Sequence, residues 1–322
     1  MKVDMRDAFF EQLVKAAYQD ERIVFLTADH GAFALRKFEE EMPDRYFNLG
    51  IAEQNMMGVA AGLAASGKIV FAYGIAPFVS LRVLEQLTID IAAMRLPVNV
   101  VSVGAGFTYS TDGPTHHGLQ DMSAVLTIPH ITVLNSSDPE NTRHFVDLVL
   151  EEPGPHYIRI EKEKVASLPR ANPEINWRKM GFSILRESQE KSVLILSTGI
   201  VTHEVMKCLD DLEKVSDVSV TVADIFQVKP FPDGLLSVIA EFDQVISIEE
   251  GYSSGFASQL LVKLSESKGA FSRLSIVALD DRFYFDYDDR PVLRARLQLK
   301  EKLIEILEKV AGRNICNPKR RG

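Results

Sequence analysis

Residues 45–75 read RYFNLGIAEQNMMGVAAGLAASGKIVFAYGI, and this stretch contains a predicted helix followed by a predicted strand. From Glu53 to Ala65 the residues are largely apolar and rich in alanine, which indicates a mostly buried helix. Gly67 follows, at a position where helices commonly end in a left-handed residue. The apolar run Ile69–Ala72 then predicts a strand that is covered on both faces, as in a parallel sheet.

Helices and strands alternate in this way along the whole chain. Eight further apolar runs predict strands: Ile23–Leu26, Val98–Val103, Ile131–Leu134, Tyr157–Ile160, Val193–Leu196, Val218–Val222, Val245–Ile248 and Leu274–Ala278. One helix is predicted to begin at Asp138 and Pro139, because Asp suits the N-cap and Pro the first helical position. The last predicted helix runs from about Pro291 to Val310. This alternation predicts βαβ units and therefore the α/β fold class.

The segment from Lys162 to Asn176 has no helical or strand period and contains two prolines. We therefore predict two domains, residues 1–165 and 185–322, joined by a linker in residues 166–184. Each domain is expected to hold a mostly parallel sheet flanked by helices. With 322 residues, of which 46% are apolar, the chain is long enough to bury two such cores.

Composition narrows the class of function. The chain has 36 basic and 45 acidic side chains, a net charge of −9, which argues against nucleic acid as a partner held by bulk electrostatics. No stretch reads as a membrane span and the N-terminus does not read as a signal peptide, so we expect no membrane partner. The two cysteines, Cys208 and Cys316, lie far apart and indicate a reducing compartment. We expect a cytoplasmic enzyme of small metabolites.

Candidate site residues occur in loops that follow the predicted strands, where open parallel sheets bind ligands. Glu53 begins an apolar helix. The helix dipole alone favours an acid there, or the carboxyl group enters apolar surroundings and keeps its proton to donate a hydrogen bond. Tyr73 and Phe78 follow the strand 69–72 and could form a flat wall for a ring, although core packing is the commoner role.

Two further segments carry charged or titratable side chains. Residues 110–121, STDGPTHHGLQD, bring Asp112, His116 and His117 together after a strand. Neighbouring histidines could be idle solvated groups, and a metal site is disfavoured because adjacent side chains rarely converge on one ion. In the strand-end sequence YIRIEK, Arg159 and Lys162 could hold an anion or remain solvated.

Four stretches in this order resemble the transketolase family of thiamin diphosphate enzymes: GIAEQNMMG (50–58), DGPTHHG (112–118), IPHITVLNSSDPEN (128–141) and DIFQVKPFPDG with ISIEEG (224–251). The resemblance covers essentially the entire chain but only the C-terminal half of a full transketolase. It implies a pyrimidine-binding domain followed by a transketolase C-terminal domain. Related chains include deoxyxylulose-phosphate synthases and the β subunits of 2-oxoacid dehydrogenases.

The resemblance also implies a cofactor, thiamin diphosphate, and residues that bind it. Glu53 matches the catalytic glutamate that forms a hydrogen bond with N1′ of the aminopyrimidine ring. Phe78 is implied to stack on that ring. Tyr73 and Ile75 would share this wall, and Asp29 matches an acidic position near the cofactor.

On the substrate side, Asp112 and His116 match positions that contact hydroxyl and carbonyl oxygens of the sugar near the reacting carbon, so His116 is a second catalytic candidate. His117 stands where the family commonly has Gln. Arg6 and Lys162 resemble positions whose cations grip a sugar phosphate. Lys162 replaces the usual arginine and lacks its planar, two-pronged donor geometry.

The family binds the diphosphate and a Mg²⁺ or Ca²⁺ ion through a GDG…N motif in a separate N-terminal domain, and no such motif occurs in this sequence. The resemblance therefore implies a split transketolase. A second polypeptide would be the N-terminal subunit that carries the diphosphate-binding domain and ligates the metal, in an α2β2 assembly.

The implied reaction transfers a two-carbon ketol unit from a ketose or ketose phosphate to an aldose. A decarboxylating subunit, like deoxyxylulose-phosphate synthase or a 2-oxoacid dehydrogenase β subunit, is the alternative enzyme. A non-catalytic subunit that only stabilises its partner is the other alternative. The presence of Glu53, Asp112 and His116 together argues against the last.

Overall fold

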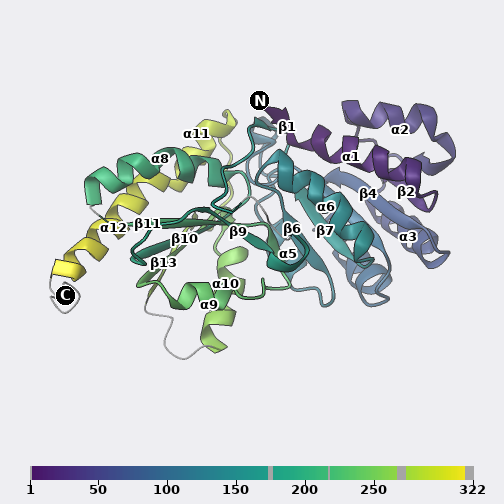
Figure 1. The fold of residues 1–322 in the computed structure, drawn as a ribbon. Coiled ribbons are helices and arrows are strands. Elements are labelled where there is room, and N and C mark those ends of the chain that lie inside the picture. Colours follow the sequence, from purple (N-terminus) through teal and green to yellow (C-terminus); the bar gives the residue numbers. More distant parts are fainter. Residues whose placement is uncertain (1, 173–176, 217, 267–272, 316–322) are drawn as a thin grey trace.

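The computed structural model describes residues 2–172, 177–216, 218–266 and 273–315. A seven-stranded sheet forms the centre of the first domain (Figure 1). Its strand order is β12-β6-β7-β5-β4-β2-β3. Its strands are β2 (Ile23–Thr27), β3 (Tyr46–Asn48), β4 (Ile69–Ile75), β5 (Val98–Val103), β6 (Thr132–Asn135), β7 (His156–Ile160) and β12 (Gln227–Lys229). All neighbouring pairs among β2 to β7 are parallel. A separate antiparallel ribbon pairs β1 (Val3–Asp4) with β8 (Lys164–Val165).

Helices cover both faces of this sheet. They are α1 (Met5–Gln19), η1 (Phe33–Leu35), α2 (Arg36–Glu41), η2 (Pro43–Arg45), α3 (Glu53–Ala65), α4 (Leu84–Gln86), η3 (Leu87–Ala92), η4 (Ser110–Asp112), α5 (Asp121–Leu126) and α6 (Pro139–Glu151). α1 packs beside α6 and buries Phe9 and Phe10 on one face. α3 buries Met56 and Met57 on the other. α3 has the predicted bounds, and Gly67 beyond it has φ +95°.

The second domain holds a five-stranded sheet in the order β14-β13-β10-β11-β9. Its strands are β9 (Phe182–Arg186), β10 (Val193–Thr198), β11 (Val220–Ile225), β13 (Gln244–Tyr252) and β14 (Leu274–Leu279), and only the edge strand β9 runs antiparallel. Its helices are α7 (Trp177–Met180), α8 (Val201–Ser216), α9 (Leu235–Ala240), α10 (Phe256–Glu266), α11 (Arg290–Arg294), η6 (Ala295–Leu297) and α12 (Leu299–Ile315). The sheet lies between α8 and α12 above and α9 and α10 below (Figure 1). The predicted class, α/β with mostly parallel sheets flanked by helices, is confirmed.

The two domains share a sheet. β12 comes from the second half of the chain, yet it pairs antiparallel with β6, Gln227 opposite Leu134 and Lys229 opposite Val133. The Lys229 Nζ donates hydrogen bonds to the carbonyl oxygens of Leu126, the last residue of α5, and of Ile128 just beyond it. The second domain thus supplies one edge strand of the first.

The nine predicted strands each overlap a strand of the structure, but three features differ from prediction. The helix expected from Pro291 to Val310 is interrupted at Gln298, which has φ +51°. The apolar spacing does not indicate this break, because Leu293 before it and Leu307 after it are both buried in the same core, as they would be in one continuous helix. α7 and the start of β9 lie inside the segment predicted as a linker.

The third difference concerns Arg159, which sequence reasoning placed at a strand end. Arg159 belongs to β7, and its side chain is buried and donates two hydrogen bonds to the Asp121 carboxylate, at 2.7 and 3.0 Å. Arg159 therefore stabilises the interior and does not face a ligand. No helix in the described part of the chain is long and apolar enough to cross a membrane.

Candidate functional site

The carboxyl ends of β2, β4, β5 and β7 meet along one edge of the first sheet. The parallel pairing of β4 with β5 runs from Val70–Val98 to Ile75–Val103, so the loops after these two strands start side by side. β7 pairs with β5 up to Ile160 opposite Val103, which brings a third loop to the same place. Parallel strands bind ligands at such edges.

Glu53 lies at this edge as the first residue of α3, where it is 4% exposed. The positive end of the helix dipole favours its charge. The Arg82 Nη1 donates a hydrogen bond of 2.8 Å to the Glu53 Oε2. The centre of the Arg82 guanidinium is also 4.2 Å from the centroid of the half-buried Phe78 ring. A flat cation thus contacts both the buried carboxylate and an aromatic face.

A row of rings continues from Phe78 across the loop ends. The Phe78 and His116 rings are 5.0 Å apart between centroids and nearly perpendicular, with 73° between their planes. His116 lies 6.2 Å from the Tyr109 ring. The Tyr109 Oη is 3.1 Å from the His30 Nε2, which joins the loop after β5 to the loop after β2. The row therefore links three strand ends.

Cations flank the far end of this row. The Lys162 Nζ lies 4.3 Å from the centroid of the Tyr109 ring, in cation–π contact, and the Lys162 side chain is exposed. Burial, together with the nearby charges of Arg6 and Lys162, lowers the pKa of His30 from the ordinary 6.5 to about 4. His30 is therefore a neutral imidazole at neutral pH, beside two cations.

Several predicted site residues lie beneath this surface. Tyr73 is fully buried, with its ring 4.8 Å from that of Phe10 and 5.1 Å from that of His30. Ile75 is partly buried against the same apolar cluster. His117 is 3% exposed; its ring meets Phe107 edge-on at 5.0 Å, and burial lowers its pKa. These three side chains support the site from within.

The two predicted aspartates are at the surface of the same edge. Asp112 is exposed in η4, directly before Gly113, which has φ +76°. Asp29 is exposed and has φ +56°; its backbone N–H and its carboxylate both bond with the Asn48 side-chain amide, at 3.0 and 3.3 Å. Neither carboxylate is among the contacts that join Glu53 to His116.

Sequence reasoning missed Arg82, His30 and Tyr109. His30 directly follows the predicted Asp29, and Tyr109 directly precedes the segment 110–121, so proximity to those segments was an available signal. Arg82 lies four residues after the predicted Phe78, but its pairing with Glu53 had no local signal, because the two are 29 residues apart. Within the described ranges, no three His, Cys, Asp or Glu side chains gather in a way that could hold a metal ion.

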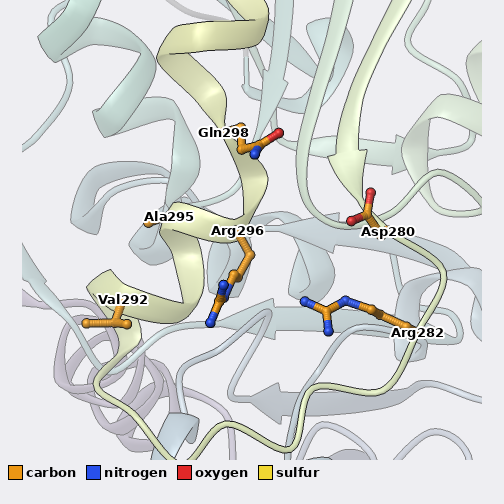
Figure 2. A pocket seen from close by; sticks show the side chains of 6 residues that line it. All are labelled: Asp280, Arg282, Val292, Ala295, Arg296 and Gln298. Carbon is orange, nitrogen blue, oxygen red and sulfur yellow. The ribbon is translucent and has the colours of Figure 1, made fainter.

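A pocket of roughly 410 Å³ opens elsewhere, in the second domain. Figure 2 shows the side chains that line it: Asp280, Arg282, Val292, Ala295, Arg296 and Gln298. The Arg282 side chain extends toward Arg296, and Arg296 pairs with Asp286 at 3.5 Å. This pocket contains none of the residues that sequence reasoning assigned to chemistry.

Two family models match the chain. The model of the transketolase pyrimidine binding domain matches residues 1–167, and that of the transketolase C-terminal domain matches residues 183–281. The chain is 36% identical over 230 residues to the 6-deoxy-6-sulfo-D-fructose transketolase subunit SqwH of Clostridium sp. (strain MSTE9), covering 71% of this chain and 70% of that protein. It is 31% identical over 265 residues to an apulose-4-phosphate transketolase subunit of Phocaeicola vulgatus, covering 81% and 84%.

A solved structure extends this likeness to nearly the whole chain. It is described as a split gene transketolase, inactive beta4 tetramer, and shares 28% sequence identity with this chain at a TM-score of 0.81. The match covers 96% of this chain and 99% of that one.

Proposed function

The chain belongs to the transketolase family, and from this membership we propose that it is the C-terminal subunit of a split, transketolase-like enzyme. The proposed reaction transfers a two-carbon ketol unit from a ketose or ketose phosphate to an aldose. The observation that carries the proposal is that the buried Glu53 carboxylate and the Phe78 ring both contact one flat group, the Arg82 guanidinium. They do so at the edge where the parallel strands end. The names of the two related subunits support it.

Thiamin diphosphate is the cofactor that the family implies, and the site fits its aminopyrimidine ring. The Arg82 guanidinium is a flat group with N–H donors, and it already contacts the Glu53 carboxylate and the Phe78 face. An aminopyrimidine ring is also flat; its amino group donates hydrogen bonds, and its N1′ accepts one from the Glu53 carboxyl group. Glu53 would hold N1′, and Phe78 would stack on the ring. When bound, the cofactor supplies the electron sink for the two-carbon unit.

The remaining residues are proposed to bind and orient the sugar. His116, edge-on to Phe78, would hold or move a proton at the carbonyl oxygen of the donor. Asp112 would accept hydrogen bonds from its hydroxyl groups. The neutral His30 would bond to the sugar without adding charge. Lys162 and Arg6 would attract an anionic group at the other end.

The buried residues would act through their neighbours. Tyr73 and Ile75 would support the aromatic wall from below, and Asp29 would sit near the cofactor at the edge of the site. The ring of His117 lies 3.3 Å from the carbonyl oxygen of Ser110 and would keep the Asp112 loop in place.

We place the diphosphate and a Mg²⁺ or Ca²⁺ ion on an N-terminal partner subunit, in an α2β2 assembly. The split-gene relative supports this assignment, because a tetramer of such chains alone is described as inactive. The cytoplasm is our proposed location, since two cysteines in 322 residues fit a reducing compartment.

The test is reconstitution with a second polypeptide that carries a GDG…N motif, to be sought in the neighbouring reading frames. The pair should transfer ketol units only when thiamin diphosphate is added. Glu53→Gln should lower the rate by about 100-fold or more while the pair still assembles. Glu187→Gln, an exposed acid paired with Lys191, is the control. Transfer by this chain alone, or normal activity of Glu53→Gln, would contradict the proposal.

A further inference from the structure

The loop that leads to Tyr109 is bound by a side chain of the second domain. Glu250, in β13, accepts a hydrogen bond of 2.8 Å at Oε1 from the backbone N–H of Phe107. Gly106 has φ +60°, and a Cβ there would collide with the Glu250 carboxylate. The loop therefore closes around this carboxylate, which is 5% exposed.

Arg290, the first residue of α11, connects the same loop to the loop that carries Lys162. Its guanidinium makes two hydrogen bonds to Glu161, Nη1 to Oε2 at 2.8 Å and Nη2 to Oε1 at 3.0 Å. Its Nη2 also donates to the carbonyl oxygen of Ala105 at 3.2 Å, and its Nε donates to the Glu250 Oε1 at 3.0 Å. Glu161 directly precedes Lys162. One buried arginine thus bonds to the backbone of the loop that leads to Tyr109 and to the side chain that precedes Lys162.

Two arginines in this cluster, Arg290 and Arg294, face three carboxylates, those of Glu161, Glu163 and Glu250. Burial alone would raise the pKa of Glu250, but Arg290 and Arg294 outweigh it and lower that pKa. Thr108 adds a link between the loops, since its hydroxyl donates to the Glu161 Oε2. Buried ions that are paired in this way resist displacement, because removing one partner leaves the other charge uncompensated.

We propose that Arg290 and Glu250 are positioning residues through which the second domain sets the site of the first. They hold the two loops so that Tyr109 meets His30 and Lys162 lies over the Tyr109 ring. This rests on the proposed function, which assigns Lys162 to the anionic end of the substrate. The second domain is then a determinant of how well a charged sugar binds.

The variant that tests this is Arg290→Lys, which keeps the charge but loses the fork that reaches both loops. Its matched control is Arg170→Lys. Arg170 is also a buried arginine with two acidic partners, Asp138 and Glu140, at 2.8 and 2.9 Å, and its side chain is 5% exposed. Both variants should lower the melting temperature, so stability alone does not separate them.

The first readout is NMR titration of histidine-labelled full-length chain, with His30 assigned from a His30→Gln sample. If Lys162 and Tyr109 move away, the pKa of His30 should rise in Arg290→Lys and stay near its wild-type value in Arg170→Lys. An unchanged pKa in both variants would overturn the proposal. This measurement needs neither cofactor nor partner, so it is independent of the proposed activity.

The second readout uses the assembled two-subunit enzyme. Arg290→Lys should raise KM for a phosphorylated ketose by about tenfold, more than for an uncharged ketose, with kcat changed less. Equal changes for both donors, or the same change in Arg170→Lys, would overturn the proposal. If Arg290→Lys does not fold, Glu250→Gln keeps an oxygen for the Phe107 N–H but loses the charge that faces Arg290 and Arg294, and an unchanged ratio of the two KM values there would overturn it too. A wild-type pair without any cofactor-dependent transfer would instead refute the proposed function.

Discussion

Arg82 donates a hydrogen bond of 2.8 Å to Glu53 from the solvent side of the site. The Arg82 side chain is 43% exposed, whereas that of Glu53 is 5% exposed. The same guanidinium lies over the Phe78 ring. A ligand that uses both the carboxylate and the ring therefore competes with Arg82 for both.

Replacing Arg82 with alanine is expected to strengthen the binding of thiamin diphosphate to the assembled enzyme. A partly exposed ion pair contributes about 1 kcal/mol, so its loss predicts a Kd that is about fivefold lower. Titration calorimetry measures this. Arg22→Ala, which breaks an exposed pair with Asp20, is the control and should leave Kd unchanged. Weaker binding in Arg82→Ala would mean that Arg82 holds Glu53 in place for the cofactor.

The elements with continuous local patterns could be predicted from sequence. α3 was recognisable because its apolar run is uninterrupted and Gly67 follows it. α6 was recognisable because Asp138 followed by Pro139 is typical of the start of a helix. In the structure the Asp138 carboxylate accepts hydrogen bonds from the backbone N–H groups of Glu140 and Asn141. Both features depend on residues a few positions apart, which a single sequence displays directly.

Contacts between distant residues could not be predicted in this way. β12 has three residues, too few for a period, and it pairs with a strand more than 90 positions earlier. Tyr109 and His30 are 79 positions apart, and Arg290 and Glu161 are 129 apart. The topology of the sheets brings these side chains together, and the spacing of residues along the sequence does not indicate that topology.

Lys162 offers a test of substrate charge. Lys162→Met should raise KM for a phosphorylated ketose by about tenfold and leave an uncharged ketose nearly unaffected, because the variant removes a single cation from the exposed end of the site. Lys162→Arg should lower KM for the phosphorylated donor, since its planar fork binds two oxygens at once. Steady-state kinetics with the two donors give the comparison. An equal response of both donors would show that Lys162 does not face a substrate anion.

Asp224 makes stability depend on pH at the contact between the domains. Burial raises its pKa from the ordinary 3.8 to about 7, although hydrogen bonds from Ser137 and Asn141 act in the opposite direction. Its Oδ2 accepts those bonds, while its buried Oδ1 has no partner among the described residues. The unfolded chain releases this proton near pH 4 and the folded chain near pH 7. Between these values the folded state holds more protons, so raising the pH lowers the free energy of unfolding.

Asp224→Asn is therefore expected to stabilise the protein more at pH 8 than at pH 5. The asparagine keeps an oxygen for Ser137 and never ionises, so it removes a penalty of up to about 4 kcal/mol at pH 8 and a smaller one at pH 5. Urea denaturation of both proteins at the two pH values measures the difference. Asp210→Asn, whose side chain is 83% exposed, should show little dependence on pH. If Asp224→Asn does not stabilise the protein more at pH 8 than at pH 5, the Asp224 carboxyl group loses its proton in the folded chain at the same pH as in the unfolded chain.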